Sequence, residues 1–448
     1  MVELKDKEYV LKTARDLGVK FIRLWFTDIL GFLKNVAITI EELEEALLEG
    51  VGFDGSAVEG FTRSEESDMI ALPDPNTFAI LPWRPKENAV ARMFCDIVRP
   101  GGEPFEGDPR YILKRNLKQA ADLGYTFYVG PELEHFYFKS LEESNAEGPK
   151  PLDLGGYFDL TPLDLASDLR RETILAMEEL GVGVEFSHHE VAPSQHEIDF
   201  RYADALTTAD NMMTYRLVVK EIALKHGVYA SFMPKPMAGQ NGSGMHVNIS
   251  LFEGERNAFF DPKDKAHLSP VAKHFLAGLL KTVREFTVVT NQWANSYKRL
   301  TPGYEAPVYV TWALTNRADL VRIPRAKPGK EEACRLELRS PDPACNPYLA
   351  FSVILAAGLE GVRSKAELPP AAETNIASLP EGERRKLGVQ ALPRDLGEAI
   401  ELGAESKLLR RALGDHIFTS FLNNKRIEWE RYGAAVTDFE LKTYLPLL

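Results

Sequence analysis

Two acidic residues separated by one position mark the first segment that could do chemistry. In GPELEHFYF, a strand pattern puts Glu132 and Glu134 on one face, because alternate residues of a strand share a face. Two carboxylates this close need either a cation between them or a strongly raised pKa. We therefore predict that this pair binds divalent metal ions.

Three further segments alternate polar and apolar residues in the same way. Their polar residues are Glu197 and Asp199 in SQHEIDF, His246, Asn248 and Ser250 in GMHVNISLF, and Arg335, Glu337 and Arg339 in CRLELRS. Any one of them alone is more typical of an amphipathic strand with a solvated face. Four together, rich in Glu, His, Asn and Arg, favour a cavity that holds cations and anions. The ligand types suit Mg²⁺ or Mn²⁺, and the lack of clustered cysteines argues against zinc.

Two loops next to these strands carry further candidates. In SHHEVAP, Glu190 is favoured as a metal ligand, since hard cations prefer oxygen. The adjacent His188 and His189 are interpreted as structural, which is the more frequent role of such a pair. In QNGSGMH, Gly242 and Gly244 form either an ordinary turn or a close approach of the backbone to a ligand.

Arginines are concentrated in the stretch from 299 to 339. They are Arg299, Arg317, Arg322, Arg325, Arg335 and Arg339. Guanidinium groups bind carboxylates and phosphates through paired hydrogen bonds, and the acidic candidates nearby favour this role over a nucleic-acid patch. Within the same stretch, PGYEAP is typical of a stiff loop that carries one carboxylate, Glu305.

The elements that must position these residues form two units. KFIRLWFTD and FLKNVAIT predict two strands joined at Gly31, and a capping box of Thr39 and Glu42 predicts a helix that stops at Gly50. The Pro- and Gly-rich stretch after Val98 predicts a boundary between domains 1–103 and 104–448.

The second unit alternates helices with antiparallel-looking strands, which indicates an α+β fold. Asn346 and Pro347 predict the N-terminus of a buried helix.

Bulk properties exclude several classes of protein. The 448 residues exceed one ordinary core, and the net charge of −13 disfavours nucleic acid as a partner. Three cysteines without a CxxC pair indicate a reducing compartment. We expect no secretory signal and no membrane span, and hence a cytoplasmic protein.

Several segments together resemble type I glutamine synthetase of bacteria and archaea, in the family's order. They are FDGSAVEGF, GPELEHF, SHHEVAPSQHE, FMPKPMAGQNGSGMH, NSYKRLTPGYEAP and RLELRSPDPACNPY. The resemblance implies an N-terminal β-grasp-like domain and a larger catalytic domain, whose curved antiparallel sheet lines a funnel-shaped active site with helices outside. It also implies a dodecamer of two six-membered rings, with active sites between subunits.

The resemblance implies glutamate–ammonia ligase activity, with L-glutamate, ammonium and ATP as substrates, in glutamine biosynthesis and nitrogen assimilation. Two or more Mg²⁺ or Mn²⁺ ions would bind at each site. The first metal would be held by Glu134, Glu190 and Glu197, and the second, near the ATP phosphates, by Glu132, His246 and Glu337.

Further roles follow from the same motifs. Substrate glutamate would meet Arg299, Arg339 and the backbone of Asn241 and Gly242. Phosphate would meet Arg317, Arg322 and Arg335, and the nucleotide Tyr202 and Ser250. Asp54 of a neighbouring subunit would deprotonate ammonium beside Tyr157, and Glu305 would lie on a flap that shuts the site.

The resemblance also points to a regulatory subtype. Members controlled by adenylylation carry a tyrosine where this chain has Ala377, so the non-adenylylated alpha subtype is implied. In that subtype an arginine after the FDGS segment is tied to feedback inhibition, and Arg63 occupies this place. Transcription factors are further partners of some members.

Two alternative functions stay open at the level of sequence. One is a relative that joins glutamate to an amine such as a polyamine, although Asp54 and Glu305 suit a small cationic nucleophile better. The other is a catalytically inactive structural or regulatory assembly, which the presence of all six metal-ligand candidates disfavours.

Overall fold

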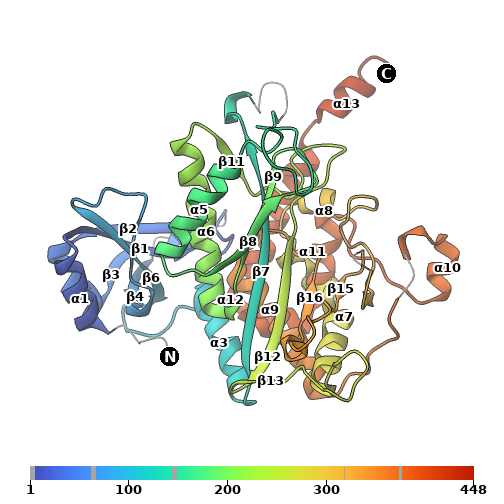
Figure 1. Ribbon diagram of the computed structural model, residues 1–448, viewed down its shortest axis with the longest axis horizontal. Helices are drawn as coiled ribbons and strands as arrows, with labels where there is room; N and C mark the ends of the chain where they lie inside the picture. The colour runs from blue at the N-terminus through green and yellow to red at the C-terminus, as the bar shows by residue number, and fades with distance from the viewer. Residues whose placement is uncertain (1–5, 62–66, 144–148, 317, 373–375) are drawn as a thin grey trace.

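A mixed sheet forms most of the N-terminal domain, drawn in blue in Figure 1. The computed structural model describes residues 6–61, 67–143, 149–316, 318–372 and 376–448. The sheet order is β2-β1-β6-β4-β3, with β5 paired to β6, and β1 runs parallel to β6. The strands are β1 Val19–Thr27, β2 Leu33–Thr39, β3 Val51–Asp54, β4 Asp68–Pro73, β5 Ala79–Ile80 and β6 Ala89–Val98.

Two helices, α1 Lys7–Asp16 and α2 Leu43–Glu49, complete this domain. Both contribute to its own hydrophobic core, α1 through Val10 and α2 through Leu43 and Leu47. This core is separate from the one beneath the large sheet.

The predicted turn between the first two strands is confirmed. Gly31 has a φ of +86°, a conformation that glycine adopts at little cost. The predicted capping box is wrong, because the Thr39 side chain makes no capping hydrogen bond. A 3₁₀ turn, η1 Ile40–Glu42, comes first and delays the α-helix to Leu43. The helix ends at Gly50, as predicted.

A large and mostly antiparallel sheet forms the centre of the remaining chain (Figure 1). Its order is β14-β15-β16-β12-β7-β9-β8. Its main strands are β7 Thr126–Phe138, β8 Val184–His189, β9 Gln195–Phe200, β12 Met245–Glu253, β14 Trp312–Ala313, β15 Val321–Arg322 and β16 Leu336–Leu338. Three short strands join its edges, β10 Ala203–Asp204, β11 Tyr229–Ser231 and β13 Arg256–Asn257.

Long helices cover one face of this sheet. They are α3 Pro109–Ala121, α5 Ser167–Glu179, α6 Ala205–Lys225, α7 Pro270–Thr290, α9 Pro347–Ser364, α11 Leu396–Glu405 and α12 Lys407–Ala434. The apolar residues of the alternating strands, such as Leu133, Ile198 and Val247, are buried in the same core as these helices. The opposite, polar face is therefore left for a site. Among the described residues, no helix is long and apolar enough to cross a bilayer.

Shorter helices lie outside this layer: α8 Ser296–Arg299, α10 Glu381–Lys386 and α13 Asp438–Thr443, the last near the C-terminus. The predicted domain boundary at 103/104 falls in the connection between β6 and α3.

The N-terminus of α9 joins the two units. The Oδ1 atom of Asn346 accepts hydrogen bonds from the backbone N–H groups of Tyr348 and Leu349, which confirms the predicted cap. Its Nδ2 atom donates to the carbonyls of Asp28 and Ile29, at 3.2 Å each. One side chain thus starts a buried helix and binds the N-terminal domain.

Candidate active site

Strand register gathers the predicted acidic residues on one face of the sheet. On β7 and β9, Glu132 lies opposite Asp199 and Glu134 opposite Glu197. On β12, His246 lies opposite Glu132. These side chains line a cavity of about 540 Å³, so the alternation that we inferred from the sequence does build a polar cavity.

One group of ligand candidates consists of Glu132, His246 and Glu337. One ligand atom from each lies within 4.8 Å of the other two. The Nδ1 atom of His246 is 3.0 Å from Glu132 and 4.0 Å from Glu337. Burial acts to raise the pKa of Glu132, but hydrogen bonds from His246 and Asn248 outweigh it and hold this pKa at about 2. Glu132 is therefore an anion ready to bind a cation.

A second group lies next to the first. His188, Glu190 and Glu197 bring one ligand atom each within 4.8 Å of one another. Glu134 is in the same cavity, where it accepts hydrogen bonds from Gln195 at 2.7 Å and from the backbone N–H of Gly244 at 2.9 Å. The predicted ligands of the first metal are thus brought together.

The carboxylates near this second group have raised pKa values because they are buried beside one another. Burial, followed by the charge of Glu190, raises the pKa of Glu134 to about 7. Burial likewise raises the pKa of Glu190 to about 7, and burial with neighbouring carboxylates raises that of Glu197. A divalent cation would supply the missing positive charge, and these oxygen donors fit Mg²⁺ or Mn²⁺.

The sequence analysis did not assign a metal-binding role to two residues in the cavity. His188 was interpreted as structural, yet its ring lies 3.4 Å from Glu190 and 3.8 Å from Glu197. In the sequence, its position two residues before Glu190 was the signal that could have indicated this role. Asp199 also lines the cavity, and burial raises its pKa to about 8.

Two of the predicted arginines pair with Glu337, which is fully buried. Arg322 and Arg339 both form ion pairs with it, Arg322 at 2.6 Å. Arg299 lines the cavity but donates to three backbone carbonyls, those of 339, 340 and 341. Arg335 donates to Asn248 at 2.9 Å. Arg317 and Arg63 lie outside the described residues, as does the side chain of Ala377.

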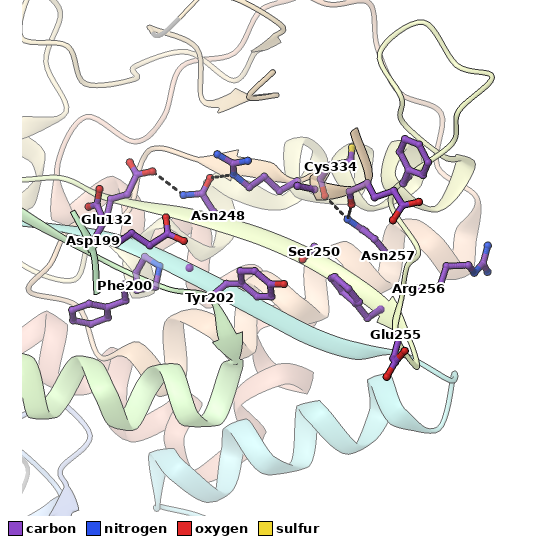
Figure 2. Close-up of a pocket in the computed structure, with 18 of the residues that line it drawn as sticks. Glu132, Asp199, Phe200, Tyr202, Asn248, Ser250, Glu255, Arg256, Asn257 and Cys334 are labelled. Carbon is purple, nitrogen blue, oxygen red and sulfur yellow. Dashed lines mark hydrogen bonds between the residues drawn. The ribbon is translucent and has the colours of Figure 1, made fainter. Parts of the chain in front are cut away.

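A larger cavity of about 910 Å³ adjoins the metal-ligand candidates (Figure 2). It shares Glu132 and Asp199 with the first cavity. Tyr202 and Ser250, the predicted nucleotide contacts, both line it, and the Tyr202 side chain is 61% exposed. Its walls also carry Phe252, whose ring stacks with that of Tyr202 at 6.5 Å. The cavity therefore offers both aromatic and carboxylate side chains.

Loops form the mouth of the metal cavity. Tyr157 lies at its rim, with its ring 5.5 Å from that of His188. Asn241 donates to Glu305 at 3.2 Å, which links the two predicted loops. A Cβ atom on Gly242 would lie 2.3 Å from the carbonyl oxygen of Pro234, so only glycine fits there. Glycine is thus required here by close approach to the protein's own backbone, and the predicted approach to a ligand stays a prediction.

Asp54 lies apart from this cavity in its own chain. It ends β3 in the N-terminal domain, where it is exposed and accepts hydrogen bonds from the backbone and hydroxyl of Ser56. It is absent from the described residues that line the cavity. A role for Asp54 at such a site therefore requires another copy of the chain.

Comparisons with known proteins agree with this architecture. The chain matches the family profile "Glutamine synthetase, beta-Grasp domain" over residues 18–100 and "Glutamine synthetase, catalytic domain" over residues 106–444. It is 54% identical to a glutamine synthetase of Mycolicibacterium smegmatis, over 99% of this chain and 100% of the relative. It is 52% identical to a glutamine synthetase of Methanosarcina mazei over the full length of both.

The fold of the chain is also similar to that of solved structures. The GmaS/ADP complex in conformation 1 superposes with a TM-score of 0.88 at 32% identity, over 98% of this chain and 99% of that chain. The predicted α+β fold, a β-grasp domain followed by a catalytic domain with a curved sheet, is confirmed. The chain belongs to the glutamine synthetase family.

Proposed function

We propose that this chain is a glutamate–ammonia ligase, which forms L-glutamine, ADP and phosphate from L-glutamate, ammonia and ATP. The observation that carries this proposal is the position of Glu132 and Glu134. They are neighbours on one face of β7, yet Glu132 belongs to one ligand group, whereas Glu134 lies opposite Glu197 of the other group and lines the same cavity. Full-length relatives at 49–54% identity are glutamine synthetases, whereas the GmaS structures are 32–33% identical.

Two or more Mg²⁺ or Mn²⁺ ions would be held at the two groups. One would use Glu134, Glu190 and Glu197, with His188 in reach, and the other Glu132, His246 and Glu337. When bound, such ions neutralise carboxylate and phosphate oxygens during phosphoryl transfer. The adjoining 910 Å³ cavity has room for ATP, with Tyr202 and Ser250 on its wall.

The first step activates glutamate. A carboxylate is a poor electrophile, so its γ-carboxylate oxygen attacks the γ-phosphorus of ATP to give γ-glutamyl phosphate and ADP. Arg322 lies beside Glu337, where it would meet the charge of the transferred phosphoryl group, together with Arg317 and Arg335. Arg299, Arg339 and the backbone of Asn241 and Gly242 would bind substrate glutamate.

The second step requires a neutral nucleophile. Asp54 from a neighbouring subunit would take a proton from ammonium, beside Tyr157, and the resulting ammonia would displace phosphate from the acyl carbon. The loop with Glu305 would exclude water from this intermediate. This assignment implies sites between subunits, as in a dodecamer of two hexameric rings. A cytoplasmic location, feedback control through Arg63 and regulatory protein partners belong to the same proposal.

The test of this function compares nucleophiles. ADP release is measured with glutamate and ATP, with either ammonium or a polyamine added. We expect ammonium to support turnover and glutamine to be the product. Release with polyamines alone would replace this function with that of an amine ligase. No release with any nucleophile, together with no Mn²⁺ binding, would indicate an inactive assembly.

A further inference from the structure

A buried carboxylate–imidazole pair lies directly behind one of the metal-ligand candidates. Asp153, in the connection between β7 and α5, and His189, the last residue of β8, are both buried. The Nε2 atom of His189 is 2.9 Å from a carboxylate oxygen of Asp153. Its Nδ1 atom is 2.7 Å from the backbone carbonyl oxygen of Glu190. Because carboxylate and carbonyl oxygens only accept, the imidazole donates from both nitrogens.

Further hydrogen bonds hold both ends of this series, the carboxylate of Asp153 and the backbone of Glu190. Asp153 accepts further hydrogen bonds from the backbone N–H groups of Ser194 and Leu165, each at 3.0 Å. The backbone N–H of Glu190 donates to the carbonyl of Gln195 at 2.7 Å. The peptide groups on both sides of the Glu190 Cα atom are therefore held, which limits the directions its carboxylate can take.

The side chain of His189 is tightly packed. A Cβ atom on Gly155 would lie 2.8 Å from the Nε2 atom of His189. The carbonyl of His189 accepts a hydrogen bond from the N–H of Phe158 at 3.1 Å. The imidazole of His189 thus holds Glu190, and the backbone carbonyl of His189 holds the loop that carries Tyr157 to the cavity.

A metal site at this pair is the competing interpretation. Asp153, His189 and His196 bring ligand atoms within 4.8 Å of one another. However, both nitrogens of His189 already face acceptors, and the Nδ1 atom of His196 is 2.7 Å from the guanidinium of Arg170. A buried cation at this distance opposes a second cation. The cluster is therefore better suited to holding protein groups than to binding an ion.

We infer that His189, held by Asp153, is a positioning residue that orients Glu190 for metal binding. The inference rests on the proposed function only in taking Glu190 as a metal ligand. Partners that orient metal ligands typically contribute about 10- to 100-fold in metal affinity. The effect should be confined to the group of Glu134, Glu190 and Glu197 and should spare the group of Glu132.

Two isosteric variants separate positioning from simple packing. In His189→Asn the side-chain nitrogen takes the place of Nδ1 and keeps the bond to Glu190. In His189→Gln it takes the place of Nε2 and keeps only the bond to Asp153. Mn²⁺ is titrated into the full-length protein, and free Mn²⁺ is followed by electron paramagnetic resonance. We expect His189→Gln to lose about 10-fold or more in affinity at one class of site, and His189→Asn, which loses the bond to Asp153 but keeps that to Glu190, to lose clearly less.

A second pair of variants leaves every polar group in place. Gly155→Ala would push a methyl group into His189, whereas a Cβ atom on Gly156 meets only ordinary contacts, the nearest at 3.6 Å. We expect Gly155→Ala to weaken the same class of Mn²⁺ site and Gly156→Ala to leave it unchanged.

Equal Mn²⁺ affinities within both pairs of variants would overturn the inference, and so would an equal loss at both classes of site. Mn²⁺ binding is measured without substrates, so these results stand whether or not the wild-type protein makes glutamine. A failure of the ligase proposal is therefore distinguishable from a failure of this one.

Discussion

At the scale of single residues, the site is defined by carboxylates whose proton affinities differ sharply. Glu132 has a pKa of about 2 because His246 and Asn248 outweigh the effect of its burial. Glu134, on the same face of β7, has a pKa of about 7, because burial is joined by the charge of Glu190. Near neutral pH Glu132 is charged, whereas Glu134 is still partly protonated and a metal must displace that proton.

This difference makes metal binding depend on pH. The pKa values of Glu134 and Glu190, about 7, and of Asp199, about 8, are raised above their ordinary values. Without metal, the protonated forms of these groups contribute to the free energy of unfolding. This contribution is fully present below about pH 4 and is lost as the pH rises toward about 8. Metal replaces the protons, so its stabilising effect should grow over the same window.

The measurement is the midpoint of thermal unfolding with and without Mg²⁺ from about pH 5 to 8. We expect the increase caused by Mg²⁺ to become larger as the pH rises. The control variant Glu134→Gln removes one titrating group and should reduce this dependence. An increase in the midpoint that is the same at every pH would contradict the proton–metal competition.

At the scale of elements, the period-two alternation was sufficient to find the polar face. It placed Glu132, Glu134, Glu197 and His246 on one side, because antiparallel register keeps alternate residues in line. It did not reveal the hydrogen-bond partners, since these come from residues distant in sequence. The three backbone carbonyls that bind Arg299 are an example.

Local signals were less reliable where two conformations compete. Thr39 and Glu42 fit a capping box, yet a 3₁₀ turn begins the element instead. Asn346 and Pro347 gave the correct helix start, because the cap is reinforced by burial and by contacts with the N-terminal domain. The tertiary contacts of Asn346 are not visible in the local pattern.

The cap at Asn346 gives a prediction at this scale. Asn346→Ala removes the cap and the side-chain donor to the carbonyls of Asp28 and Ile29, of which that of Asp28 keeps the N–H of Gly31 at 3.0 Å. We expect it to lower the free energy of unfolding by about 2–4 kcal/mol. Asp395→Ala, which removes only the cap of α11, should cost about 1 kcal/mol. Denaturant unfolding measures both, and equal losses would argue against a role of Asn346 in joining the domains.

At the scale of the whole molecule, the N-terminal domain lies to one side of the strands that carry the metal-ligand candidates (Figure 1). Asp54 is exposed on that domain and is not part of the cavity of its own chain. The sequence could predict two domains and their order, but not this separation, which depends on how the domains pack. A catalytic Asp54 must therefore act on a neighbouring subunit.

Complementation of two inactive variants tests this arrangement. Asp54→Ala and Glu337→Ala are expected to be inactive when made alone. Co-expressed, they should regain up to about a quarter of wild-type activity, since a shared site can combine an intact residue from each subunit. The control pair Glu337→Ala and Arg339→Ala affects the same large domain, so it should regain nothing. No recovery in mixed assemblies would place Asp54 outside the site.

The most direct test of the ligase function is the formation of glutamine from glutamate, ammonium and ATP over a range of Mg²⁺ concentrations, in wild type and in Glu337→Ala. Glu337 is fully buried, and among the described residues it is the only carboxylate that forms ion pairs with Arg322 and Arg339. We expect Mg²⁺-dependent glutamine formation in wild type and a loss of at least about 100-fold in the variant. Full activity in Glu337→Ala, or no glutamine from wild type at any Mg²⁺ concentration, would contradict it.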